Sequence, residues 1–203
     1  MIKLFILTTL LLINLNAFGF ETAKNNKFED ELSAVPKISN NFTFNFPDIK
    51  LVDQYYQPVE LSQMFGHEKN IVFAFFFTQC ISICETITLS IHSIKDSLPP
   101  NTQIAMISID PNTDTPEILN TYAENHRISD PNWKLLTGDK MQIIKLQKNF
   151  EAYRGNKMNH STSLFIKKAY SNTISEITGG FSIIPQLLTN PIQTSLSKIE
   201  KVE

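Results

Sequence analysis

Continuous apolar runs alternate with segments of helical spacing along most of the chain. Ile71–Phe77 (IVFAFFF) is bounded by polar residues and is typical of a central strand buried on both faces. Gln103–Asp110 (QIAMISID) predicts a second buried strand. Phe42, Phe44 and Phe46 alternate with polar residues, which predicts a half-buried strand. Further short strands are expected within Val59–Phe65 (with a helical turn), Trp133–Leu136, Ser163–Ile166 and Thr173–Ile177.

Apolar residues at helical spacing predict helices between these strands. Ile83–Leu98 has such a stripe, and Pro99 ends it. Thr115 and Pro116 open the next helix, because threonine is a good N-cap and proline suits the first helical position. The apolar stripe of this helix is expected at Ile118, Leu119 and Tyr122. Two more helices are expected at Asp139–Phe150, capped by Asp139, and at Pro185–Ile199.

This alternation of strands and helices predicts an α/β fold, with a central mixed sheet and helices on both faces. The sequence shows no internal repeat. In sheets of this kind ligands gather at the carboxyl ends of the strands. Residues that directly follow Ile71–Phe77 are therefore the first candidates for a functional site.

The first 19 residues are predicted to be a signal peptide or an N-terminal membrane anchor. Lys3 is a minimal basic region, Leu4–Leu15 is mostly apolar, and Ala17 and Gly19 supply the small residues of a cleavage site. Either outcome would expose the rest of the chain outside the cytoplasm, in the periplasm or at the outer face of the inner membrane. Residues 20–40 are polar and aperiodic and are predicted to be a flexible tether, and residues 41–203 form the predicted domain.

Composition narrows the function classes. The chain has 203 residues, which suits one domain, and 42% hydrophobic residues, which can form a core. A net charge of −2 gives no electrostatic attraction for nucleic acid. The two cysteines are too few for a multi-disulfide scaffold or a four-cysteine metal site.

The two cysteines, Cys80 and Cys84, are four residues apart just after the first buried strand. At the start of a helix this spacing puts both sulfurs on one side. The helix N-terminus should favour the thiolate and so raise metal affinity. Two thiolates suit Cu(I) or zinc, and one added imidazole makes a site suited to copper. The pair could also form a disulfide, or be two inert buried cysteines.

The third ligand must be one of four histidines. His67 lies in a polar turn, His92 lies within the predicted helix after the cysteines, and His126 lies at the end of the Thr115 helix. His160 directly precedes a predicted strand, so the sheet can bring its loop to the cysteines. His160 is therefore the predicted third ligand. Asp110, at the end of its strand, either caps the following turn or supports a ligand.

These residues resemble a known family. The frame FFFTQC-x3-C, followed by SIDP-x2-DTPE and a late NHS before a strand, is similar to the Sco/SenC proteins from about Asn41 to Ile199. The resemblance implies a thioredoxin-like fold. It also implies copper ligation by Cys80, Cys84 and His160, with Asp110 close to the site. The family commonly has a proline after each cysteine, where this chain has Ile81 and Glu85.

The resemblance implies a copper metallochaperone that delivers Cu(I) or Cu(II) to cytochrome c oxidase during assembly. Its partners would be the copper-bearing oxidase subunit or another copper chaperone, with the membrane close to the N-terminus and no nucleic acid. One alternative is a thiol–disulfide oxidoreductase in which Cys80 and Cys84 are catalytic and reduce the cysteines of a copper site. The other is a diverged assembly protein that binds no metal.

Overall fold

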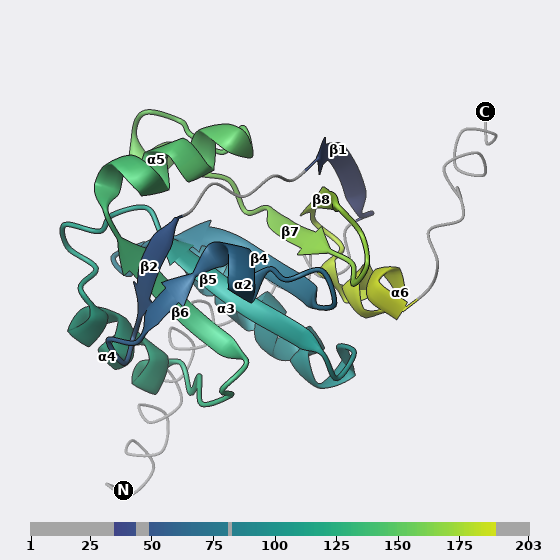
Figure 1. Cartoon of the computed structure of the whole chain (residues 1–203), viewed down its shortest axis with the longest axis horizontal. Helices are drawn as coiled ribbons and strands as arrows, with labels where there is room; N and C mark the ends of the chain where they lie inside the picture. Colours follow the sequence, from purple (N-terminus) through teal and green to yellow (C-terminus); the bar gives the residue numbers. More distant parts are fainter. Residues whose placement is uncertain (1–34, 44–48, 81–82, 190–203) are drawn as a thin grey trace, which may run out of the picture.

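The computed structural model describes residues 35–43, 49–80 and 83–189 (Figure 1). Its strands are β1 (Lys37–Thr43), β2 (Lys50–Asp53), β3 (Pro58–Glu60), β4 (Asn70–Phe76), β5 (Thr102–Ser108), β6 (Trp133–Gly138), β7 (Leu164–Lys167) and β8 (Thr173–Thr178). Its α-helices are α2 (Leu61–Met64), α3 (Ile83–Ile94), α4 (Pro116–Asn125), α5 (Lys140–Asn149) and α6 (Ile184–Thr189). Short 3-10 helices cover η1 (Lys95–Ser97), η2 (Lys157–Asn159) and η3 (Phe181–Ile183).

The strands form one mixed sheet in the order β1-β8-β7-β4-β5-β6-β2-β3. The pairs β4–β5 and β5–β6 are parallel, while β4–β7, β7–β8, β1–β8, β2–β6 and β2–β3 are antiparallel. The predicted α/β fold with a central mixed sheet is therefore confirmed. Because β4 and β5 run side by side in the same direction, the loops that follow them open at the same edge of the sheet.

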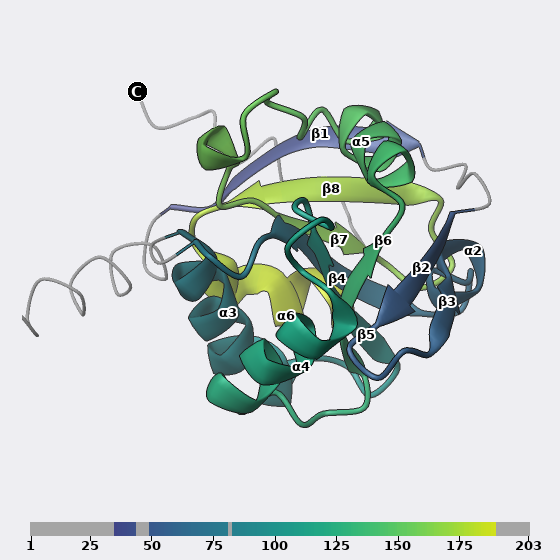
Figure 2. The ribbon, with the colours of Figure 1, turned by 90° about the vertical axis from the view of Figure 1, so that its left-hand side faces the viewer.

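Strand β4 separates two hydrophobic cores by strict alternation. Val72, Ala74 and Phe76 pack in the core under α3, α4 and α6, which lie on one face of the sheet in Figure 2. Ile71, Phe73 and Phe75 pack in the core under α5 on the other face. All seven residues of β4 are buried, as the continuous apolar run predicts.

The core under α5 is rich in aromatic rings. The Phe73 and Phe165 rings stack with centroids 4.8 Å apart, and Phe150 meets Phe73 edge-on at 5.0 Å. Phe42 of β1 reaches the same cluster, with its ring 5.4 Å from that of Phe150. Offset and edge-on pairs of this kind add stability beyond their buried area. The aromatic cluster therefore stabilises the packing between the sheet and α5.

Two helix starts follow the predicted capping chemistry. The Thr115 side chain accepts a hydrogen bond from the N–H of Ile118, and Pro116 is the first residue of α4. The Asp139 carboxylate accepts from the N–H of Gln142 at 2.9 Å at the start of α5. Each cap satisfies a backbone donor that the helix itself cannot. These short-range signals are thus sufficient to place the N-terminal ends of α4 and α5.

Several predicted boundaries differ from the structure. Strand β1 begins at Lys37, inside the segment predicted as tether, because it pairs with β8 from Lys37 onward. Strand β2 was not predicted from the sequence. Ile118 is 42% exposed, so it does not belong to the buried stripe of α4. The last helix spans Ile184–Thr189, and the remainder of the predicted helix lies outside the described residues.

Within residues 35–43, 49–80 and 83–189, no helix has the length and apolar character that crossing a membrane requires. The predicted signal peptide or anchor at residues 1–19 lies outside the described residues. Phe44 and Phe46, which were predicted to continue the first strand, also lie outside them.

Candidate metal centre

The two cysteines lie where the chain leaves the end of β4. The N–H of Cys80 donates to the carbonyl of Phe77 at 3.2 Å, which turns the chain back toward α3. Cys84 is the second residue of α3 and is fully buried, whereas Cys80 is half-buried. The N–H of Phe77 donates to Cys84 Sγ at 3.4 Å. The end of the strand and the start of the helix thus hold the two sulfurs close together.

His160 reaches the cysteines from a loop 80 residues further along the chain. It ends the 3-10 turn η2, and its N–H donates to the carbonyl of Lys157 at 3.3 Å. Its Nε2 lies 3.5 Å from Cys80 Sγ and 3.4 Å from Cys84 Sγ. The antiparallel pairing of β7 with β4 brings this loop to the edge of the sheet where β4 ends.

The three side chains form a compact set of potential ligands. Cys80 Sγ, Cys84 Sγ and His160 Nε2 all lie within 4.8 Å of one another. A single ion between them would have two soft sulfur ligands and one imidazole nitrogen. Soft sulfur ligands favour Cu(I) or zinc, and two sulfurs with one imidazole suit copper. The donor set therefore fits copper as a bound cargo.

Burial changes the protonation of both kinds of ligand. Burial raises the pKa of the Cys84 thiol well above its ordinary value, with smaller contributions from neighbouring Cys80 and Asp114. At Cys84 burial therefore outweighs the helix N-terminus, which was expected to favour the thiolate, and favours the thiol instead. Burial lowers the pKa of His160, which favours the neutral imidazole that ligates metals. Binding a cation at Cys84 must release the thiol proton.

Asp110 lies close to the site, and its contact with the histidine loop is made through Lys157. Its carboxylate forms an ion pair with Lys157, with Oδ2 2.5 Å from Nζ. The same ammonium lies 5.0 Å above the ring of Phe77, and that ring packs edge-on against His160 with centroids 5.3 Å apart. Among the described hydrogen bonds none joins Asp110 to Cys80, Cys84 or His160. Asp110 thus holds the histidine loop through Lys157.

The structure adds Asp114, to which the sequence assigned no role. This fully buried carboxylate accepts hydrogen bonds from the N–H of Thr78 at 3.1 Å, from Thr78 Oγ1 at 2.5 Å and from Ser108 Oγ at 2.5 Å. It ties the residues before Cys80 to the end of β5. Sequence spacing gives no sign of this burial; the one available signal is a threonine directly after an entirely apolar strand.

The other three histidines have different surroundings. His67 is exposed, and its ring meets that of Tyr170. His92 Nε2 contacts the carbonyl of His126 at 2.7 Å, and its ring packs on Trp133. The His126 ring lies 4.1 Å from that of Tyr122. In the part of the chain that the structure describes, Cys80, Cys84 and His160 are the one group of three or more candidate ligands.

The fold and these three residues define a thioredoxin-like domain with a candidate metal site of two cysteines and one histidine. The sequence profile of the SCO1/SenC family matches residues 40–186. This match covers more than half of the chain. The chain therefore belongs to the SCO1/SenC family.

Individual proteins agree with this assignment. A protein from Stutzerimonas stutzeri that is named as copper-binding is 35% identical over 106 residues, which is 50% of each chain, so this chain matches about half the length of that relative. BsSco is described as a member of the Sco family of cytochrome c oxidase assembly proteins with a disulfide switch. Its structure is 21% identical with a TM-score of 0.59, and the match covers 76% of this chain and 95% of BsSco. Yeast Sco1 with copper bound is 18% identical with a TM-score of 0.55, covering 81% and 94%. The two structures show a shared fold.

Proposed function

We propose that this protein binds copper through Cys80, Cys84 and His160 and delivers it to cytochrome c oxidase during assembly. The observation that carries the proposal is the position of His160 Nε2, 3.5 and 3.4 Å from the two sulfurs. The copper-binding name of the Stutzerimonas relative, the copper bound in yeast Sco1 and the assignment of BsSco to a family of oxidase assembly proteins support it. The recipient is the copper-bearing oxidase subunit or another copper chaperone, outside the cytoplasm.

The burial of the ligands suits a protein that holds an ion and then releases it. Cys84 is fully buried and His160 is 6% exposed, so water has little access to that side of the ion. Cys80 is half-buried and offers a sulfur that an incoming ligand can approach. Because the Cys84 proton leaves on binding and returns on release, transfer depends on pH.

Anaerobic Cu(I) titration of the reduced protein tests the proposal. We expect one copper per chain, and an affinity that falls more than about a hundredfold in Cys84→Ser and His160→Ala, because losing a ligand exceeds the roughly 10–100-fold effect of residues that support ligands. His67→Ala is the matched control, since His67 is exposed and outside the ligand group. Unchanged affinity in both Cys84→Ser and His160→Ala would refute copper ligation at this site.

A thiol–disulfide oxidoreductase is the second candidate function. The two sulfurs lie within 4.8 Å, so a modest movement would bring them to bonding distance, and BsSco is described as having a disulfide switch. Cys80, the more exposed sulfur, would attack the substrate disulfide, and Cys84 would then resolve the mixed disulfide. The raised pKa of Cys84 slows that second step. A Cys84→Ser variant that traps no mixed disulfide with an oxidised copper-site peptide would exclude this activity.

A further inference from the structure

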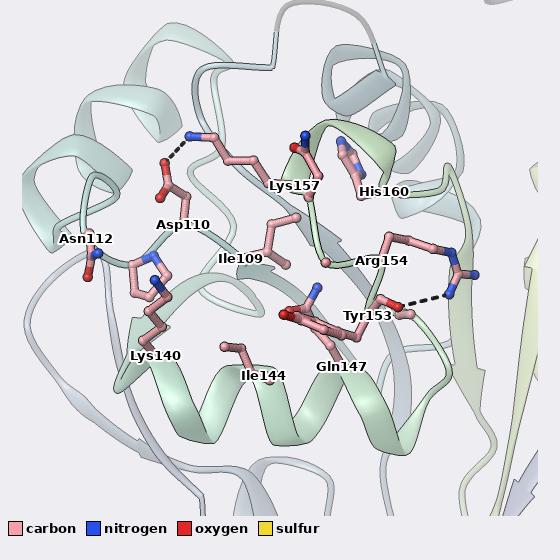
Figure 3. Close-up of a pocket in the computed structure, with 14 residues that line it drawn as sticks. Ile109, Asp110, Asn112, Lys140, Ile144, Gln147, Tyr153, Arg154, Lys157 and His160 are labelled. Atoms are coloured by element: carbon pink, nitrogen blue, oxygen red, sulfur yellow. Dashed lines mark hydrogen bonds and ion pairs between the residues drawn. The ribbon is translucent and has the colours of Figure 1, made fainter.

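A pocket of about 490 Å³ lies next to His160, between α5, the residues that follow β5 and the loop that carries His160 (Figure 3). His160 and Lys157 lie along one wall, and Asp110 lies beside Lys157. Helix α5 forms the floor in Figure 3, with Ile144 and Gln147 facing the space. Since His160 belongs both to the ligand group and to this wall, the pocket adjoins the candidate metal site.

The pocket carries a positive charge that its own residues do not neutralise. It is lined by the cations Lys140, Arg154 and Lys157 and by one carboxylate, that of Asp110. Lys157 already pairs with Asp110. Among the described residues neither Lys140 nor Arg154 forms an ion pair, and the Arg154 guanidinium donates to the carbonyls of Glu151 and Tyr153. The whole chain has a net charge of −2, so this basic site has the opposite sign to the protein.

The interior of the pocket is partly apolar. Ile109, Ile144 and Ala152 line it, and Tyr153, 39% exposed, lies near its centre in Figure 3. Its volume is within the roughly 300–1,000 Å³ range of clefts that hold ligands. A ligand with an apolar side chain flanked by carboxylates would pack against the apolar lining and pair with the cations of the rim.

We propose that this pocket is the docking site for an acidic segment of the protein that exchanges copper with this chain. The nature of that partner rests on the proposed function, whereas the charge and shape of the pocket do not. Cys84 and His160 are both buried and Cys80 is half-buried, so an incoming ligand would reach the ion at Cys80, while a partner seated in this pocket lies directly beside His160. Lys140 and Arg154, neither of which forms an ion pair among the described residues, would attract carboxylates and disfavour basic partners.

A peptide titration of the reduced, metal-free full chain tests the docking site. The probe is the peptide acetyl-Glu-Leu-Glu-Leu-Glu-amide, compared with the same peptide carrying Gln in place of Glu, and binding is followed by the NMR amide shifts of Asn112, Arg154 and Gly155. We expect the Glu peptide, but not the Gln peptide, to shift these amide signals. The affinity for the Glu peptide should fall as salt is added.

Two variants locate the charge. Lys140→Glu should weaken peptide binding at least about fivefold, since a repulsive charge replaces an attractive one on the rim. Lys140 is the first residue of α5, where an acidic residue favours the helix, so this variant keeps its fold. Lys145→Glu is the matched control, because Lys145 is exposed on the same helix and does not line the pocket. Arg154→Gln should weaken binding as well, by removing the second free cation.

Each result decides the proposal. Equal binding of the Glu and Gln peptides, or equal loss in Lys140→Glu and Lys145→Glu, would overturn it. So would binding to phosphatidylglycerol vesicles that depends on Lys140 while the Glu peptide does not bind, since the pocket would then take a membrane surface. The Cu(I) titration separates the two proposals: a chain that binds the peptide but no copper disproves the proposed function alone, and one that binds copper but no peptide disproves the docking site alone.

Discussion

The two halves of the metal site are held in place by interactions of different kinds. On the cysteine half, which comprises Cys80 and Cys84, the buried carboxylate of Asp114 receives three hydrogen bonds from Thr78 and Ser108. On the histidine half, residues 157–160, the tie is an ion pair between Lys157 and Asp110 whose side chains are 35% and 17% exposed. Buried, fully satisfied hydrogen bonds rigidify a site, whereas ion pairs near water add little stability.

This difference indicates that the two halves of the candidate site are held with different rigidity. The cysteine half is set by the fold itself, because its anchor joins the ends of β4 and β5 in the interior. We expect the histidine half to move more easily, because its anchoring ion pair is partly exposed and lines the pocket. Under the proposed copper delivery, we expect His160 to dissociate from the ion before either cysteine.

The largest effect is expected from breaking the anchor of the cysteine half. In Asp114→Asn the amide cannot accept all three hydrogen bonds, so the free energy of unfolding should fall by about 2–4 kcal/mol. The Cu(I) affinity should fall about 10–100-fold, because the turn before Cys80 is no longer fixed. Urea unfolding and Cu(I) titration measure these two quantities. Asp96→Asn, at an exposed carboxylate, is the control, and an effect of the same size in both variants would contradict a special role for Asp114.

A smaller effect is expected from breaking the anchor of the histidine half. Lys157→Met should change the free energy of unfolding by less than about 1 kcal/mol, as is usual for a partly exposed ion pair. Copper affinity should nevertheless fall about three- to tenfold, because the His160 loop loses its ion pair with Asp110. This loss is at or below the low end of the roughly 10–100-fold effect of residues that orient ligands. Stopped-flow transfer of Cu(I) to a chelator should show that the loss lies in faster release. Lys145→Met provides the comparison; slower release in Lys157→Met would reverse the assigned roles of the two halves.

The smallest effect is expected from titrating Asp110. Burial alone would raise its pKa, but the hydrogen bonds from Lys157 and Thr113 outweigh burial and leave the pKa below its ordinary value. Because the folded pKa is lowered, the contribution of this ion pair is complete above the unfolded pKa of about 3.9 and is lost as the pH falls through the folded value. Carboxyl ¹³C NMR should place the pKa of Asp110 higher in Lys157→Met than in the wild type. Identical titrations would show that Lys157 does not stabilise the carboxylate.

Local signals in the sequence were enough for most of the fold. The apolar run at Ile71–Phe77 predicted β4, and Thr115 and Asp139 marked the starts of α4 and α5. Strand β2 was not predicted; it is stabilised by pairing with β3 and β6, and such long-range pairing is not visible in the sequence. Ile118 was misplaced because periodicity indicates which residues share a side of a helix but not how wide the buried stripe is.

Some residues of the candidate site could likewise be predicted from the sequence, and others could not. The spacing of Cys80 and Cys84 and the position of His160 before a strand identified three residues that the structure brings within 4.8 Å of one another. Asp110 was expected to cap its turn or to support a ligand, but its ion-pair partner Lys157 could not be predicted because it lies 47 residues away. Asp114 could not be assigned, because whether a carboxylate is exposed or buried depends on what packs over it.

The sequence by itself therefore determined the ligand candidates and the order of strands and helices, which depend on residue type and short-range periodicity. The tertiary structure alone decided the chemistry of those ligands. Complete burial raises the pKa of Cys84 and so favours its thiol, whereas its place at a helix start was expected to favour the thiolate. Burial also lowers the pKa of His160, which favours the neutral imidazole, and packing alone placed a basic pocket beside it. Solvation is a property of the assembled fold, so no local pattern of residues specifies it.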